Sequence, residues 1–298
     1  MLATALHYFG DQKNARCHIE RMLASYAALA QQPRIVRFQF DQRVTAHYFQ
    51  ARILWLQGSA DEAKRVVEHN IEEGRAVGNT LSMCSVLGQG ACPIAYLSGD
   101  LDAAERYGAM LLEHADRYGP RIWRIWAGCF NGLVMTKCGD IAGGVRAMRG
   151  GLEAAGDARF LPRFLLLLGE LAICLGAADE VEAGLILVEE TLARCEARDE
   201  RWYLAELLRI KGELLILQGL PDAASASEDL FGQALDVARR QGALSWELRA
   251  ATSLARLRRD QQRVAEARKL LGSVYERFTE GFATADLQSA RRLLGQLS

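Results

Sequence analysis

Small and apolar residues recur along the chain at fixed distances from a series of turn residues. The turn residues are Gly10, Gly58, Gly99, Gly139, Gly176, Gly219 and Asp260. Successive turns are separated by 48, 41, 40, 37, 43 and 41 residues. Self-similarity with such a period is typical of a solenoid, in which each unit contacts mainly its neighbours. The pattern therefore predicts a repeated unit rather than one conventional core.

The side chains on either side of each turn are mostly small. Seven residues before the turns stand Ala3, Ala51, Cys92, Gly132, Gly169, Gly212 and Ser253. Five residues after the turns stand Ala15, Ala63, Ala104, Gly144, Val181, Ala224 and Ala265. Glycine can adopt the left-handed conformation that ends a helix, and small side chains let two antiparallel helices approach closely. The repeating unit is therefore predicted to be a helical hairpin.

Polar residues and prolines near the turns predict how the helices begin and bend. Because aspartate accepts hydrogen bonds from the first backbone N–H groups of a helix, four aspartates three residues past a turn are expected to cap helices. These are Asp61, Asp102, Asp179 and Asp222. Ser245 and Thr284 are expected to cap two later helices. Pro93 lies inside a predicted helix and should kink it or remove one hydrogen bond.

The units are expected to form one all-α domain over residues 1–298, a right-handed superhelix of about seven hairpins. Their approximate bounds are 1–30, 44–77, 80–118, 121–155, 160–197, 200–241 and 244–278. A connector around Pro33 explains the long first spacing. A helix over 284–297 should cap the last apolar face, as solenoids require. Because the first hairpin has no such cap, we expect a further domain to precede it.

Composition narrows the possible partners. Half of the residues are hydrophobic, and the formal net charge is −1, which gives no electrostatic footprint for direct nucleic-acid binding. No apolar stretch approaches the ~18 residues of a membrane span, so we expect a cytoplasmic protein. The cysteines lack zinc-site spacing. Cys92, Cys138 and Cys174 are expected to be small core residues in a reducing compartment.

The sequence contains no motif of a known catalytic site. Walker A, H-E-x-x-H and G-x-S-x-G patterns are all missing. The histidines at positions 7, 18, 47, 69 and 114 are interpreted as surface or interhelical residues. We therefore predict no catalytic, cofactor-binding or metal-binding residue, and a protein that is not an enzyme.

A binding groove is the better candidate for a functional site, because the first helices of stacked hairpins line the concave face. Aromatic and arginine side chains, which are favoured interface anchors, occur on three such helices. They are Trp123, Arg124 and Trp126 on one helix, Trp202, Tyr203, Glu206 and Arg209 on another, and Trp246 and Arg249 on a third. The alternative is that the tryptophans belong to the interhelical core. The sequence leaves these two interpretations open.

The repeats resemble tetratricopeptide-like helical hairpins with a longer repeat unit than usual. Three segments, at residues 201–215, 242–256 and 274–287, resemble large bacterial predicted ATPases of the STAND signal-transducing type. In that family a winged-helix or nucleotide-cyclase domain and a P-loop ATPase precede such an array. This chain has none of those catalytic motifs, so no catalytic residue is carried over.

The resemblance implies a non-catalytic sensor or scaffold of a bacterial signalling or transcription regulator. It would bind a protein segment or effector in its concave groove, and its partner would be another protein or its own upstream ATPase domain. The alternative is a small-molecule receptor with an enclosed pocket between hairpins. No cofactor, nucleic acid or membrane is implied.

Overall fold

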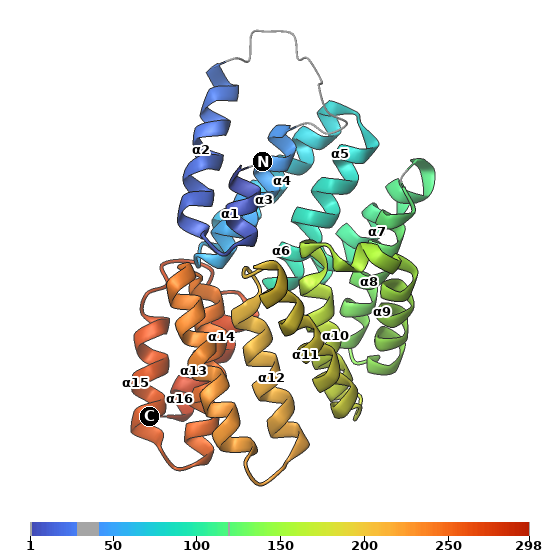
Figure 1. The fold of residues 1–298 in the computed structure, drawn as a ribbon. Helices are drawn as coiled ribbons and strands as arrows, with labels where there is room; N and C mark the ends of the chain where they lie inside the picture. The colour runs from blue at the N-terminus through green and yellow to red at the C-terminus, as the bar shows by residue number, and fades with distance from the viewer. Residues whose placement is uncertain (1, 29–41, 119, 298) are drawn as a thin grey trace.

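The computed structural model describes residues 2–28, 42–118 and 120–297, and all regular elements in those residues are helices. This confirms the predicted all-α class. The predicted connector around Pro33 lies outside the described residues. The helices follow one another as antiparallel neighbours (Figure 1). The division of the chain into domains stays a prediction.

Helix pairs follow the predicted succession. They are α1 (Leu2–Tyr8) with α2 (Gln12–Ala28), α3 (Gln42–Leu56) with α4 (Ala60–Val77), α6 (Cys92–Leu97) with α7 (Leu101–Tyr118), α8 (Arg121–Lys137) with α9 (Ile141–Ala155), α10 (Leu165–Ala177) with α11 (Val181–Arg198), α12 (Leu204–Gln218) with α13 (Ala223–Gln241), and α14 (Leu244–Asp260) with α15 (Val264–Tyr275). The last helix is α16 (Ala285–Gln296). Shorter elements are α5 (Thr80–Ser85), η1 (Val86–Ala91), η2 (Gly156–Phe160) and η3 (Pro162–Phe164).

Six of the turns share one backbone motif. One residue has a positive φ, and the N–H of the next residue donates to the carbonyl five positions earlier, at 2.8–3.0 Å. This is the hydrogen bond of a Schellman helix end. The positive-φ residues are Gly10, Gly58, Gly99, Gly139, Asp179 and Gln262. The glycine prediction is therefore confirmed for the first four hairpins. It is also confirmed at Gly219, which ends α12 with a φ of 71°.

The predicted register was wrong in the fifth and seventh hairpins. Gly176 lies within α10 and Asp260 is the last residue of α14, whereas Asp179 and Gln262 carry the positive φ. With the register corrected, Gly184 rather than Val181 faces the preceding helix. A Cβ on Gly184 would lie 2.7 Å from the Ala172 carbonyl oxygen. The close helix approach is thus retained in this hairpin.

In the sixth hairpin the turn is longer, so the residue of α13 that packs against Gly212 of α12 lies further along α13 than predicted. Ser227, not Ala224, is buried against Gly212. Its hydroxyl donates to the Gly212 carbonyl at 2.8 Å. A Cβ on Gly212 would lie 2.6 Å from the Phe231 ring, so a mid-helix glycine is required there despite its poor helix propensity.

Helix capping also differs from the prediction. The capping carboxylates are Asp11, Asp100 and Asp140, one residue past the glycine instead of three. Asp222 and Thr284 occupy N-cap positions without a side-chain bond. Asp61 and Asp179 have other roles. The carboxylate of Asp61 accepts a hydrogen bond from the Gly281 N–H, and Asp179 is the positive-φ residue of the turn after α10. Ser245 lies inside α14 and is bonded elsewhere.

Pro93 distorts its helix, as predicted. Because proline lacks an N–H, the chain widens into the π-helix η1 directly before Cys92. The Cys92 N–H donates to Leu87, which frees the Gly88 carbonyl. That carbonyl accepts from Trp126 Nε1 at 2.8 Å, so a tryptophan of the next hairpin satisfies the distorted helix.

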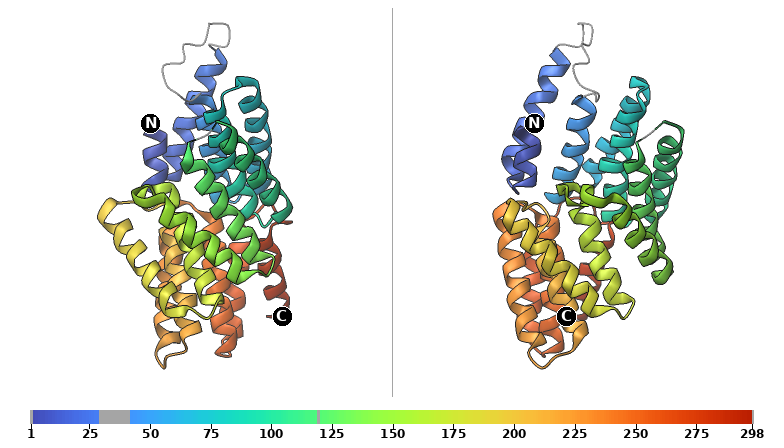
Figure 2. Two further views of the ribbon diagram at one scale, coloured as in Figure 1. Left: turned by 90° about the vertical axis from the view of Figure 1, so that its right-hand side faces the viewer. Right: turned by 45° about the vertical axis from the view of Figure 1, so that its right-hand side comes forward.

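The array curls so that its C-terminal helices lie against the turns of the N-terminal hairpins (Figures 1 and 2). The Arg201 N–H donates to the Tyr8 carbonyl at 2.8 Å, and the Ala285 N–H donates to the Ser98 carbonyl at 3.2 Å. We call this set of contacts the closing interface. Its two sides are residues 8–10, 55–62 and 97–99, and residues 201–202, 241–249 and 278–286.

Apolar side chains are buried along the array in three clusters. One runs from α3 to α14, a second joins α13 to α16, and a third joins α2 to α3. Cys92 and Cys174 are buried in the first cluster, but Cys138 is exposed, so the core prediction was wrong for Cys138. Among the described helices, none is both long and apolar enough to cross a bilayer.

Candidate functional site

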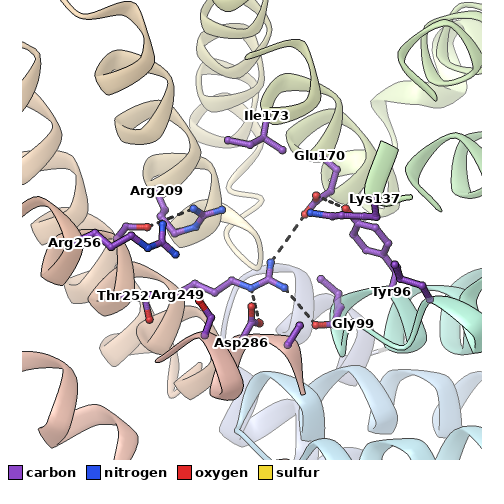
Figure 3. Close-up of a pocket in the computed structure, with 15 residues that line it drawn as sticks. Tyr96, Gly99, Lys137, Glu170, Ile173, Arg209, Arg249, Thr252, Arg256 and Asp286 are labelled. Carbon is purple, nitrogen blue, oxygen red and sulfur yellow. Dashed lines mark hydrogen bonds and ion pairs between the residues drawn. The ribbon is translucent and has the colours of Figure 1, made fainter. Parts of the chain in front are cut away.

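A cavity of about 310 Å³ lies where the third to seventh hairpins meet α16 (Figure 3). Its wall combines residues from helices that are far apart in sequence. They include Tyr96, Gly99, Lys137, Glu170, Ile173, Arg209, Arg249, Thr252, Arg256 and Asp286. The cavity therefore depends on the curled arrangement of the whole array.

Arg249 on α14 is at the centre of this wall. Its Nε donates to Asp286 Oδ2 at 2.7 Å, and its Nη1 donates to Glu206 Oε1 at 2.9 Å. Its Nη2 donates to the Leu97 carbonyl at 3.3 Å, and the guanidinium lies 5.1 Å from the centroid of the Trp246 ring. One side chain thus joins α6, α12, α14 and α16.

Glu206 on α12 binds two arginines at once. Arg209, three residues later on the same face, donates to both of its carboxylate oxygens at 2.8 Å. Burial alone would raise the pKa of Glu206, but Arg209 and Arg249 lower that pKa to about 2. Asp286, Glu206 and Glu170 in turn hold the pKa of Arg249 well above its usual range, although burial acts against this. These groups remain charged near neutral pH.

Glu170 is the acceptor on the opposite side of the cavity. Tyr96 Oη donates to it at 2.5 Å and Tyr203 Oη at 3.2 Å. Burial, together with the nearby carboxylate, raises the pKa of both phenols well above the usual value. The two tyrosines therefore stay protonated and act as hydrogen-bond donors.

The open rim of the cavity is basic. Lys137 and Arg256 are exposed, and Lys137 Nζ lies 5.7 Å from the centroid of the Tyr96 ring. Among the described residues Lys137 has no ion-pair partner. The lining contains four cationic side chains and two carboxylates, those of Glu170 and Asp286. Glu206 and Glu213, which lie behind the lining, pair with Arg209, Arg249 and Arg256. Lys137 is therefore the cation that a ligand of this cavity would meet without an ion-pair partner among the described residues.

The structure brings three of the predicted groove residues together at this cavity. Glu206, Arg209 and Arg249 form one ion-pair network. The adjacent aromatic residues are not on the surface: Trp202, Tyr203 and Trp246 are 2%, 0% and 1% exposed. Two of them contact the charged groups directly: the Trp246 ring lies beside the Arg249 guanidinium, and Tyr203 donates to Glu170. These rings therefore belong to the interhelical core, which was the alternative to a groove surface in the sequence analysis.

The other predicted cluster lies outside the cavity. Trp123 and Trp126 are buried against η1, where a Cβ on Gly88 would lie 2.8 Å from the Trp123 ring. Arg124 is exposed and forms an ion pair with Asp116 at 2.6 Å. The indoles fill the space beside the π-helix, so they do not form a groove surface.

Sequence reasoning missed Tyr96, Lys137, Glu170 and Asp286. Glu170 carried a usable signal, since it is the only charged residue of α10, in the run LLLLGELAICLGA. A lone carboxylate in a buried helix needs partners, and it finds two tyrosines. The other three have ordinary sequence surroundings and meet the site only through the curl of the array.

No protein-family model and no curated protein matches the sequence. Among solved structures, 47 chains match. A Rap protein complexed with competence and sporulation factor has a TM-score of 0.65 at 11% identity, covering 99% of this chain and 78% of that chain. Yeast Tom70 has a TM-score of 0.49 at 13% identity, covering 85% of this chain and 47% of that chain.

The likeness to the Rap structure shows the fold. This chain has a tetratricopeptide-like helical-repeat fold. At 11% identity the likeness does not extend to particular site residues.

Proposed function

We propose that this chain is a non-catalytic scaffold that binds an acidic protein segment in its central cavity. The supporting observation is Lys137, an exposed cation on the lining that has no ion-pair partner among the described residues. Arg256, also exposed, has one such partner, Glu213, at 3.4 Å. Arg209 and Arg249 are both held by the buried carboxylate of Glu206, and Arg249 is also held by the partly exposed Asp286. A carboxylate of a partner would complete the coordination of the exposed cations on the rim.

The titratable groups of the cavity favour binding over acid–base chemistry. A general acid or base works best when its pKa lies near the working pH. The pKa of Glu206 is lowered to about 2, and the pKa values of Tyr96 and Tyr203 are raised. These groups keep their charge state near neutral pH, which suits a fixed recognition surface.

The biological setting is proposed from the resemblance at residues 201–215, 242–256 and 274–287. We infer a sensor or scaffold of a bacterial signalling or transcription regulator, which binds another protein or its own upstream ATPase domain. The Rap structure, which is complexed with competence and sporulation factor, supports this setting only as a precedent for a complex on the same fold.

A peptide-array experiment tests the proposal. The chain is probed against peptides of one length that differ in net charge, and hits are measured by fluorescence anisotropy. We expect acidic peptides to bind, with affinity that falls as salt rises. The double variant Lys137→Ala/Arg256→Ala should bind about 10-fold or more weakly, because two charge-assisted contacts are lost.

The matched control is Lys13→Ala, which removes an exposed lysine of α2 far along the chain from the cavity. It should bind like the wild type. Equal binding by the double variant and by Lys13→Ala would place recognition elsewhere and contradict the proposal.

A small anionic effector is the second candidate, favoured by the cavity volume. About 310 Å³ is at the small end of the range typical for ligand pockets. A thermal-shift screen with di- and tricarboxylates separates the two candidates, because a specific ligand stabilises the native state by RT ln(1 + [L]/Kd). A shift that is abolished in Lys137→Ala/Arg256→Ala would favour the effector.

A further inference from the structure

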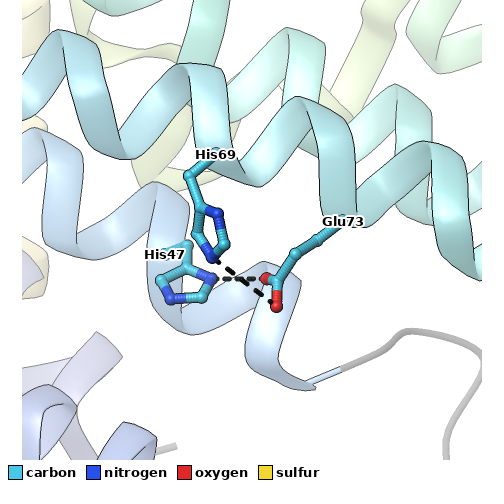
Figure 4. A group of neighbouring side chains, drawn as sticks. All are labelled: His47, His69 and Glu73. Atoms are coloured by element: carbon cyan, nitrogen blue, oxygen red, sulfur yellow. Dashed lines mark ion pairs between the residues drawn. The ribbon is translucent and has the colours of Figure 1, made fainter.

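Three metal-ligating side chains meet on the second hairpin, away from the central cavity (Figure 4). His47 lies on α3, and His69 and Glu73 lie one turn apart on α4. One ligand atom from each residue lies within 4.8 Å of the other two. The rings of His47 and His69 are 5.2 Å apart at a steep angle of 78°.

The contact between His47 and Glu73 is unusual for an ordinary ion pair. Nδ1 of His47 lies 2.7 Å from Oε2 of Glu73. Both atoms are buried, yet neither has a partner with hydrogen-bonding geometry. Buried polar atoms are nearly always satisfied. These two atoms are in direct contact as an ion pair, so an ion that binds both would lie beside them and would have to push them apart.

We propose that His47, His69 and Glu73 bind a divalent transition-metal ion of the zinc class. Imidazole nitrogen and carboxylate oxygen are preferred zinc ligands, and three protein ligands leave one position for water. Magnesium and calcium, which prefer all-oxygen sites, fit this set poorly.

Small adjustments complete the coordination geometry. Bonds of about 2.0–2.1 Å in a tetrahedron place donor atoms roughly 3.3 Å apart. The His47–Glu73 pair must open by a few tenths of an ångström from 2.7 Å. His69 Nε2, now 3.8 Å from Glu73 Oε1, must move closer, and its side chain is 58% exposed and therefore free to rotate.

The three side chains bind a metal in their deprotonated forms, as neutral imidazoles and a carboxylate. Arg43 forms an ion pair with Glu73 Oε1 at 3.9 Å, and a metal ion on this carboxylate would compete with it.

Such a site would act as a clamp. The two helices of the second hairpin would be joined through an ion near the start of α3 and the second half of α4. Because the ion binds only the folded arrangement of the three ligands, its binding free energy adds to the stability of this hairpin.

The test uses the full chain without a histidine tag, first stripped of metal. Zn²⁺ is titrated by calorimetry and by competition with a chelator, and Co²⁺ is titrated with absorption spectroscopy. We expect one site with a dissociation constant of about 1 μM or lower and a rise in Tm. Mg²⁺ should produce neither effect.

Two ligand variants and one control locate the ion. His69→Ala and Glu73→Gln should each weaken zinc binding by at least about 10- to 100-fold. His114→Ala removes a half-buried histidine of α7 and should leave the affinity unchanged. Because His69 is largely exposed, His69→Ala should fold, which keeps the test informative if Glu73→Gln is unstable.

Several outcomes would overturn the proposal. Absence of zinc binding by the wild type would do so directly. Binding that is equal in His69→Ala and His114→Ala would place the ion elsewhere. A thiolate-to-cobalt charge-transfer band would assign the metal to cysteines, of which Cys17 and Cys138 are exposed.

Discussion

The turn at Gly99 and the turn at Gly139 have the same backbone motif but different surroundings. Both glycines have a positive φ, 75° and 102° respectively. A Cβ on Gly99 would lie 2.4 Å from the Cβ of Ala285, whereas a Cβ on Gly139 would meet no atom within 4 Å. The motif ends a helix in both places. Only at Gly99 does the absence of a side chain also allow another part of the chain to dock.

The polar groups around the turns also differ between turns in the closing interface and turns outside it. In the closing interface, the Ser245 hydroxyl donates to the Trp55 carbonyl at 2.5 Å, and the Gly281 N–H donates to Asp61 at 2.9 Å. Outside it, exposed charges join neighbouring hairpins, as Arg149 and Glu180 do. Helix ends that would otherwise be solvated thus become contact surfaces in the first three hairpins.

The largest expected effect comes from Arg249, a cation of the closing interface whose side chain is only 15% exposed. Arg249→Met leaves Asp286 without its cation, Glu206 without one of its two cations, and the Leu97 carbonyl without its donor. Removing one partner of a buried ion pair costs about 3–5 kcal/mol. We expect a loss of this size in the free energy of unfolding, measured by urea denaturation.

The matched control removes an arginine of the same type outside that interface. Arg149 pairs with Glu180, and their side chains are 40% and 43% exposed. Because exposed pairs contribute about 0–1 kcal/mol, Arg149→Met should change stability by no more than that. Equal losses in the two variants would show that the closing interface is not held by its buried charges.

The pH dependence of stability sharpens the comparison. The pKa of Glu206 is about 2 in the folded protein, against an ordinary value of 4.5. A lowered pKa stabilises the fold above the unfolded value, and this contribution is lost as the pH falls from about 4.5 towards 2. The difference corresponds to about 3 kcal/mol.

Urea denaturation at a series of pH values checks this. Glu206→Gln should be less stable than the wild type at pH 7, and the gap between the two should narrow on acidification below about pH 4.5. A gap that stays constant down to about pH 3 would show that Glu206 does not titrate as its arginine neighbours require.

Local regularities were predictable from the sequence, and long-range closure was not. The small residues that face each other at Gly132 and Gly144 follow from the offsets around each turn. The register failed at Asp179 because aspartate tolerates a positive φ, so a search for glycine selected a neighbouring residue.

The closing interface leaves almost no trace in the sequence. The Glu62 N–H donates to Glu280 across 218 residues, and Arg249 reaches the Leu97 carbonyl across 152 residues. Such contacts use backbone groups, which every residue has. By contrast, the Glu206–Arg209 pair was predictable from helical spacing, and Glu170 carried a signal as the lone charge of α10. Lys137 carried none.

The smallest of these differences is that between Gly99→Ala and Gly139→Ala. Both substitutions force alanine into the left-handed region, at a cost of roughly 1–2 kcal/mol. Gly99→Ala must also displace Ala285 at the start of α16, and overpacking of this kind costs typically about 1–3 kcal/mol more. Denaturation of the two variants side by side measures that excess. Equal losses in the two variants would mean that α16 can move away from the new methyl group at no cost in stability. The contact between α16 and the turn at Gly99 would then not be tight. An excess that disappears in Gly99→Ala/Ala285→Gly would locate it at this pair of atoms.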